Sequence, residues 1–164
     1  MTSGNAASLA RRFRADGFVV LPDAVGPELC GAVRAACMAH YAPLLDTPPG
    51  RDPVNGVRPE WEEYATDVLP WVPPPSDAAS PFDDVVALPL LREATAACVG
   101  DGFSEIAPLA MLTPPGGKGQ AWHQDCPPGN PDVHNLNRLL YPADVLPGDG
   151  DVVVVPGSHR AGLI

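Results

Sequence analysis

The residues of this chain best suited to chemistry are His123 and Asp125, in the run Trp122-His123-Gln124-Asp125. On a β-strand alternate side chains point the same way, so an imidazole and a carboxylate two residues apart would project from one face. Together they could supply two of the three ligands of a two-histidine-one-carboxylate iron site, which leaves positions open for small molecules. A His-x-Asp triplet alone is a weak signal, because a surface histidine beside a surface aspartate explains it equally well.

The other three histidines fit a metal shell less well. His159 follows Pro156-Gly157-Ser158, a turn sequence, so we expect it beyond the end of a strand, hydrogen-bonded or solvated rather than ligating. His134 lies in the polar run PGNPDVHN and is interpreted in the same way. His40 falls in a helical pattern and is interpreted as a helix-end residue favoured by the helix dipole.

Composition limits the classes of protein and partner. The 164 residues suit one domain with its own core, and 45% hydrophobic with 18% charged residues is neither a disordered nor a membrane composition. A net charge of −10 disfavours nucleic acid as a partner. The chain has no apolar run of membrane-spanning length, and its start has no secretory signal, so we expect a cytoplasmic protein without a membrane partner. The four cysteines, Cys30, Cys37, Cys98 and Cys126, include no CxxC pair, so a reducing compartment is the default. Cys30 and Cys37, seven residues apart in a helical pattern, are interpreted as small buried apolar residues rather than as part of a disulfide framework.

Periodicity predicts helices in the first two-thirds of the chain and short strands after them. The second predicted helix has an apolar stripe at every fourth residue (Leu29, Val33, Cys37 and Tyr41) and should be stopped by Pro43. The predicted helices are Ser8–Arg14, Pro27–Ala42 and Leu88–Val99, the last ended by Gly100. The predicted strands are Phe18–Leu21, Phe103–Thr113, Gln120–His123, Leu136–Val145 and Val152–Val155. Helices followed by short strands and Gly/Pro turns predict an antiparallel barrel or sandwich with helices packed outside.

A proline-rich segment, residues 47–81, separates the second and third predicted helices. Its prolines remove backbone donors and exclude long regular elements. Two interpretations remain open, a disordered insertion and an ordered cover on the substrate side of the domain. The aromatic residues Trp61, Tyr64 and Trp71 favour a cover that packs on the body of the domain.

Four segments in this order give the His-x-Asp triplet a context: DGFVVLP, PPG…WHQD, N-x-N-R-L-L-Y and VVPGSHRAG. From roughly Leu9 to Ile164 the chain resembles the phytanoyl-CoA dioxygenase family. The resemblance implies a mainly β, or α+β, double-stranded β-helix of the cupin type with N-terminal helices outside. It also implies Fe(II), 2-oxoglutarate as cosubstrate, O₂, and hydroxylation of a small organic substrate. His123 and Asp125 match the family's first two iron ligands, while Trp122 would pack beside the strand and Gln124 would face away from the metal.

The family's third ligand is a later histidine, followed by an arginine that binds the 2-oxoglutarate carboxylate. Neither Arg138 nor Arg160 stands at the matching place, and of the apolar run IAPLAMLT only Thr113 could contact the cosubstrate. We therefore expect a single domain over residues 1–164 that is incomplete at its C-terminus. The alternative function is that of a catalytically inactive truncated homologue or fragment, acting at most as a weak metal-binding or interaction domain. The sequence fixes neither the substrate nor the oligomeric state, and its one lysine, Lys118, gives no sign of a coenzyme A site.

We expect residues 1–164 to turn over 2-oxoglutarate poorly or not at all, because one iron ligand and the arginine are missing together. Losing the buried partner of a carboxylate costs about 2–5 kcal/mol, and each 1.4 kcal/mol is roughly tenfold in affinity. The measurement is Fe(II)-dependent succinate release. Adding a downstream segment should restore succinate formation, and His123→Ala in that extended chain should abolish it. Robust turnover by residues 1–164 that is sensitive to His123→Ala would contradict this expectation and make His159 the third ligand.

Overall fold

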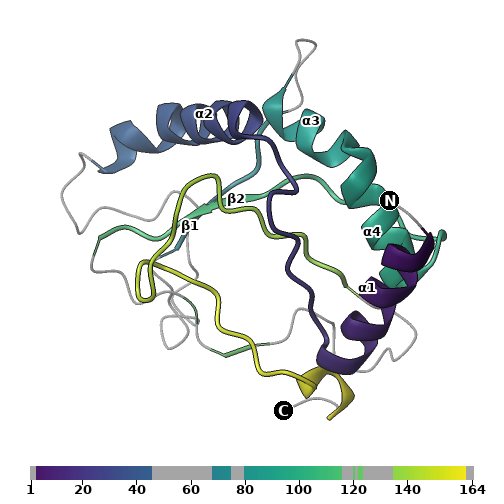
Figure 1. Cartoon of the computed structure of the whole chain (residues 1–164). Helices are drawn as coiled ribbons and strands as arrows, with labels where there is room; N and C mark the ends of the chain where they lie inside the picture. Colours follow the sequence, from purple (N-terminus) through teal and green to yellow (C-terminus); the bar gives the residue numbers. More distant parts are fainter. Residues whose placement is uncertain are drawn as a thin grey trace. The chain divides into compact units, whose positions relative to one another are not determined.

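The computed structural model describes residues 3–45, 68–74, 80–115, 120, 122–123 and 135–161. Its elements in chain order are α1 (Ser3–Asp16), α2 (Pro27–Leu45), β1 (Leu69–Trp71), α3 (Pro81–Ala87), α4 (Pro89–Val99), β2 (Ala110–Leu112) and the 3-10 turn η2 (Ser158–Arg160) (Figure 1). Unit 1, one of two compact units, comprises Met1–Cys30, Pro75–Pro108 and Val152–Ile164, and unit 2 comprises Gly31–Pro74 and Leu109–Asp151. In the described part of the chain, no helix is both long and apolar enough to cross a membrane.

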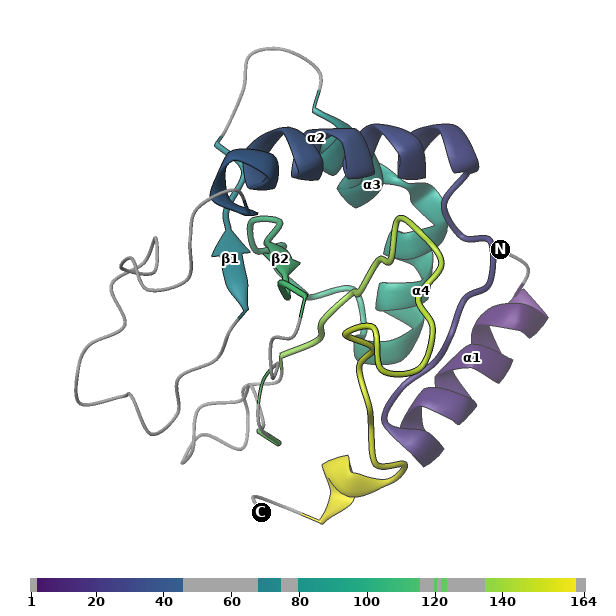
Figure 2. The ribbon, with the colours of Figure 1, turned by 90° about the vertical axis from the view of Figure 1, so that its left-hand side faces the viewer.

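Unit 1 is built on helix-to-helix packing. Helix α1 packs against α4, and α3 also contacts α4 (Figures 1 and 2). The buried residues of the first pair are Leu9 and Ala10 on α1, and Ala94 and Thr95 on α4. The buried Thr95 hydroxyl donates to the carbonyl of Leu91 at 2.8 Å, so its polar atom is satisfied inside its own helix. We expected α4 to lie against a sheet, and its described partners are helices instead.

Proline and serine set where α3 and α4 begin. The Ser80 hydroxyl accepts the backbone N–H of Phe82 at 3.3 Å, and Pro81 occupies the first turn, where its missing N–H costs nothing. Helix α3 was not predicted, because its start lies at the edge of the proline-rich segment. Helix α4 begins at Pro89, one residue later than predicted, and ends at Gly100, whose φ of +89° suits a residue without a side chain.

Two other helices run further than their patterns indicated. Helix α1 includes the predicted Ser8–Arg14 and extends beyond it at both ends. The prediction that Pro43 stops the second helix is wrong, since α2 continues through it to Leu45. Pro43 lies two residues before the helix ends, so only a little helix follows the hydrogen bond that it removes. The apolar stripe of α2 is confirmed, with Val33 and Tyr41 buried.

The strand predictions were less accurate than the helix predictions. Within the described residues, β1 and β2 form a two-stranded antiparallel sheet in the register Leu69↔Leu112 and Trp71↔Ala110. The predicted strand Phe103–Thr113 shrinks to Ala110–Leu112. The predictions of strands at Phe18–Leu21, Leu136–Val145 and Val152–Val155 are wrong, because the structure describes these residues and does not place them in strands. Strand propensity selects residues that suit a ladder, but a strand also needs a partner at the right distance and register.

The C-terminal end of α1 is capped by a turn from the far end of the chain. The backbone N–H of Gly157 donates to the carbonyl of Asp16 at 2.8 Å, and Nε2 of His159 lies 3.1 Å from the carbonyl oxygen of Arg14. A carbonyl can only accept, so Nε2 carries the proton. These two contacts satisfy carbonyls that have no partner within the helix. The expectation that His159 sits in a turn and forms a hydrogen bond is confirmed.

Replacing Gly17 with alanine should cost more stability than the same change at Gly100. Both residues have a positive φ, +85° and +89°. That conformation costs an L-residue roughly 1–2 kcal/mol. A methyl group on Gly17 would in addition overlap the imidazole of His159, whereas Gly100 faces open space. The free energy of unfolding, measured by urea denaturation, should therefore fall further for Gly17→Ala.

The control for this comparison is His159→Ala, which removes the imidazole. Alone, it should lower the free energy of unfolding by about 0.5–1.5 kcal/mol, as expected for one hydrogen bond. In that background the cost of Gly17→Ala should drop to the cost of Gly100→Ala. Equal costs of the two glycine substitutions with His159 in place would contradict the close approach of His159 to Gly17.

Candidate metal site

The C-terminal half of α2 holds β1 within unit 2 (Figure 2). The side chain of Tyr41 is 2% exposed, and its hydroxyl donates to the carbonyl of Leu69 at 2.9 Å. The ring of His40 stacks on Trp71 with 4.2 Å between centroids and an interplanar angle of 7°. Tyr41 meets the same indole edge-on, at 6.2 Å and 81°. One hydrogen bond and two ring contacts therefore hold β1, which lies within the proline-rich segment 47–81, against α2.

These contacts correct one interpretation and support another in part. His40 is not a helix-end residue held by the dipole, because its partner is the Trp71 ring. Trp71 does pack on the body of unit 2, as the cover interpretation expected of the aromatic residues in 47–81. Trp61 and Tyr64 lie outside the described residues, so the choice between cover and insertion stays open for most of that segment.

Burial favours the neutral forms of Tyr41, Cys37 and Cys98. Burial, with a smaller contribution from the negative charge of the nearby Cys37, raises the pKa of Tyr41 to about 12. Burial also raises the pKa of the Cys37 thiol. In unit 1, burial raises the pKa of Cys98, which the nearby Arg14 partly offsets. Cys30, Cys37 and Cys98 are half-buried free thiols, which agrees with the prediction of small reduced side chains; Cys126 lies outside the described residues.

His123 is exposed and belongs to unit 2. The described residues around it, 120 and 122–123, are not in a strand. Trp122 is 73% exposed, so the expectation that it packs beside a strand is wrong. Asp125, Gln124 and His134 lie outside the described residues. The convergence of His123 and Asp125 on one metal therefore stays a prediction.

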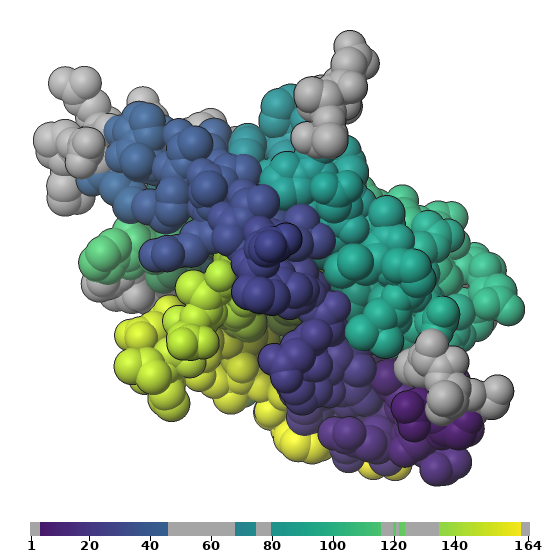
Figure 3. Space-filling view, turned by 45° about the horizontal axis from the view of Figure 1, so that its top comes forward, coloured from purple at the N-terminus to yellow at the C-terminus, as the bar shows by residue number. Residues whose placement is uncertain are grey.

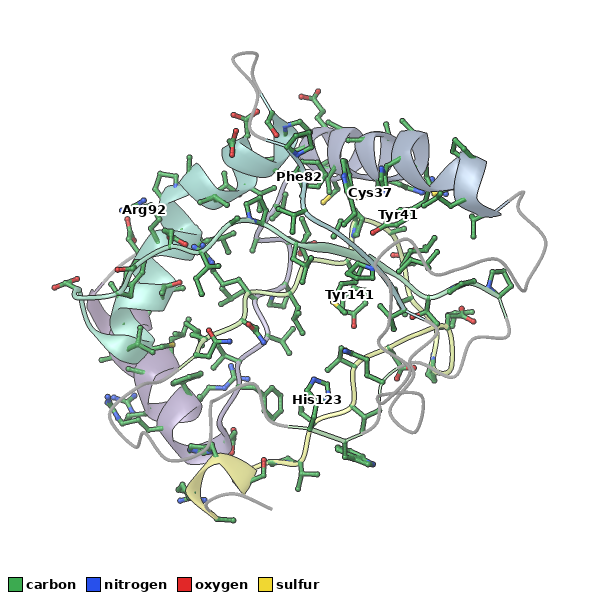
Figure 4. All side chains as sticks on the ribbon, turned by 180° about the vertical axis from the view of Figure 1, so that it is seen from behind. Cys37, Tyr41, Phe82, Arg92, His123 and Tyr141 are labelled. Atoms are coloured by element: carbon green, nitrogen blue, oxygen red, sulfur yellow. The ribbon has the colours of Figure 1, made fainter. Side chains whose placement is uncertain are left out.

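Tyr141 is a candidate that the sequence argument left without a role. It follows residues 135–140, where half-buried and exposed side chains alternate as they would along a strand. Its side chain is 43% exposed, and in Figure 4 the side chains of His123 and Tyr141 point toward one another. The signal was present in the motif N-x-N-R-L-L-Y, whose last residue is this tyrosine. A phenol in this place could donate a hydrogen bond to a bound carboxylate or carbonyl.

Among the described residues, no three His, Cys, Asp or Glu side chains are grouped closely enough to hold a metal ion. His159 bonds to a carbonyl of α1, as the turn sequence suggested. Arg160 belongs to the same turn, and its Nη2 lies 3.1 Å from the place that a Cβ on Gly157 would take. Arg138 is half-buried, with its Nη1 atom shielded from solvent.

A family model described as phytanoyl-CoA dioxygenase (PhyH) matches residues 13–164. The chain belongs to the phytanoyl-CoA dioxygenase family. No curated protein and no solved structure matches it. The family is one of dioxygenases with a cupin-like jelly-roll fold that use Fe(II) and 2-oxoglutarate, while the described part of this member contains two short strands.

The residues of this phytanoyl-CoA dioxygenase family member fit ferrous iron in their chemistry. Imidazole nitrogen and carboxylate oxygen are the donor types that non-haem Fe(II) takes, and His123 is exposed, so a metal ion can reach its ring. His40 and His159 have their ring partners elsewhere, in Trp71 and in the Arg14 carbonyl. Of the four histidines, only His123 is followed by an Asp two residues later.

Tyr41→Phe tests how firmly α2 holds β1. Removing the hydroxyl should lower the free energy of unfolding at neutral pH by about 0.5–1.5 kcal/mol, because the Leu69 carbonyl loses its donor. The raised pKa of Tyr41 adds a second signature. The unfolded chain loses the phenol proton near pH 10 and the folded chain only near pH 12, so wild-type stability should fall between these values. Denaturation across this range should show a shallower fall for the variant; identical slopes would contradict the burial of Tyr41.

Proposed function

We propose that this chain supplies the iron-binding pair of an Fe(II)- and 2-oxoglutarate-dependent dioxygenase that hydroxylates a small organic substrate. The family match over residues 13–164, with His123 and Asp125 at the positions of the first two ligands, carries the proposal. The reaction balances as R–H + 2-oxoglutarate + O₂ → R–OH + succinate + CO₂. Bound Fe(II) supplies the redox chemistry that couples decarboxylation of the keto acid to hydroxylation of the substrate.

Residues of unit 2 bind the metal, orient the cosubstrate or substrate, and hold the strands in place. His123 and Asp125 hold the metal, and Asp125 contributes the negative charge of the pair. Tyr141 orients the cosubstrate or substrate with its phenolic hydrogen bond. Thr113, half-buried directly after β2, is the polar group of an otherwise apolar run and offers a second hydrogen bond. The buried Tyr41 and the ring stack of His40 on Trp71 keep β1 in place, which steadies its antiparallel partner β2.

We further propose that the complete fold is the double-stranded β-helix of this family. Support comes from the antiparallel pairing of β1 with β2 and from the alternation of exposure along residues 135–140. Leu136, Arg138 and Leu140 are the half-buried residues of that stretch, so its period is that of a strand with one covered face.

A second candidate function is a weak metal-binding domain without turnover. The two candidates share the metal pair and differ in whether 2-oxoglutarate is consumed. Metal binding and succinate release must therefore be measured side by side.

His123→Ala and Asp125→Ala should each weaken binding of Co(II), used in place of Fe(II), by at least about tenfold, because each removes one metal ligand. Isothermal titration calorimetry gives the dissociation constant, and the visible spectrum of bound Co(II) reports the loss of a nitrogen ligand. The matched control is His134→Ala, which removes another histidine of the same region and should leave Co(II) binding unchanged.

The outcomes separate the candidates. Co(II) binding through the pair, together with Fe(II)-dependent succinate release that His123→Ala abolishes, even where that release is slow, supports the dioxygenase. Binding through the pair without succinate supports the weak metal-binding domain. If His134→Ala weakened binding as much as His123→Ala, or if Asp125→Ala had no effect, the assignment of the metal ligands would be wrong.

A further inference from the structure

One face of the stretch Asn135–Tyr141 in unit 2 lies on the same side as His123. Exposed residues alternate with half-buried ones along this stretch, and side chains at every second position of an extended chain point to the same face. Because the side chains of Tyr141 and His123 point toward one another in Figure 4, the other exposed residues of the stretch lie on the His123 side as well. These exposed residues, which we call the site row, are Asn135, Asn137, Leu139 and Tyr141.

The site row contains two amides, one leucine and one phenol, and none of its members is acidic or basic. Arg138, the charged residue of the stretch, is half-buried on the opposite face. A bend at Pro142 and Ala143 ends the alternation, so Asp144 lies beyond the row. Figure 3 shows yellow-green residues of this part of the chain at the surface of the face displayed. A charged group that bound against the row would therefore lose hydration without gaining an ion-pair partner from it.

We propose that the site row determines which substrate this dioxygenase accepts, and that the substrate is a small uncharged molecule with an apolar part and a hydroxyl, carbonyl or amide group. This inference rests on the proposed function, because it takes His123 as a ligand of the iron. The amides of the row can both donate and accept hydrogen bonds, so they match each of these polar groups.

Leu139 is the member of the row that recognises the apolar part of the substrate. Its side chain is 63% exposed, and covering it with a ligand removes apolar surface from water. Leu139 stands one step along the row from Tyr141, which is about 6–7 Å, or twice the rise per residue of an extended chain. A molecule of about that length, bound beside His123, can therefore contact the leucine at one end and the phenol at the other.

Three probes that share a six-carbon ring test the substrate class: cyclohexanol, cyclohexanecarboxylate and cyclohexylammonium. Their dissociation constants for the full chain are measured by saturation-transfer difference NMR without metal, so that the carboxylate cannot bind through a metal ion. Cyclohexanol should bind at least about threefold more tightly than either charged probe, because the row offers a charged group no partner. With Co(II) added, the ring protons of bound cyclohexanol should broaden, because the row faces His123.

Leu139→Asp tests the role of the row. The new carboxylate gives a cation a partner and removes the apolar contact, so cyclohexylammonium should now bind more tightly than cyclohexanol. The matched control is Leu146→Asp, which places the same charge at a leucine of unit 2 that is 66% exposed but outside the row. This control should keep the wild-type preference for cyclohexanol.

The outcomes separate this inference from the proposed function. The inference is overturned if a charged probe binds the wild-type chain as tightly as cyclohexanol, if no probe binds, or if Leu139→Asp and Leu146→Asp show the same preference. Cyclohexanol signals that stay sharp beside bound Co(II) would also overturn it, while leaving the metal pair intact. If Co(II) does not bind through His123 and Asp125, the proposed function itself is wrong.

Discussion

The carbonyl groups at the C-terminal end of α1 have no partner in their own helix, and unit 1 depends on how they are satisfied. Gly157 and His159 supply the two donors. His159 lies 145 residues further along the chain than Arg14, whose carbonyl it contacts. Forming this contact closes a long loop of the chain, and the hydrogen bonds and packing of the turn must offset the entropy that this closure costs. It requires Gly17 to be a glycine, since the imidazole occupies the space that a side chain would need.

How much of the fold could be predicted from the sequence depends on whether the residues that determine an element lie within it or far away in the chain. Helices are encoded by nearby residues: the stripe ending in Tyr41 and the stop at Gly100 identified α2 and α4, and Ser80 with Pro81 would have identified α3. Strands are encoded by partners that lie far away in the chain. The run Val152–Val155 has the composition of a strand but is not one in the structure, and β1 lies within a proline-rich segment whose composition did not indicate a strand.

The candidate site shows the same division. The family was identified from motif order, which needs no structure, and the match to the family model confirms it. The metal-ligand roles of His123 and Asp125 rest on the same motifs and stay predictions. The turn sequence before His159 correctly placed that histidine among hydrogen-bonded turn residues. The contacts that pair residues from separate elements were out of reach. Neighbouring residues in the sequence do not predict that His40 stacks on Trp71 or that the side chains of Tyr141 and His123 point toward one another. Both arrangements depend on how separate segments of the chain pack.

The hydrogen bond between Tyr41 and Leu69 has a consequence for how the two positions can change over evolution. The acceptor is a backbone carbonyl, which every amino acid at position 69 would present equally well. The donor is a side chain that only tyrosine provides with this reach. Position 69 should therefore accept many apolar residues in homologous chains, whereas position 41 should be nearly invariant. The hydrogen bond therefore constrains the residue type at position 41 and leaves the residue type at position 69 unconstrained.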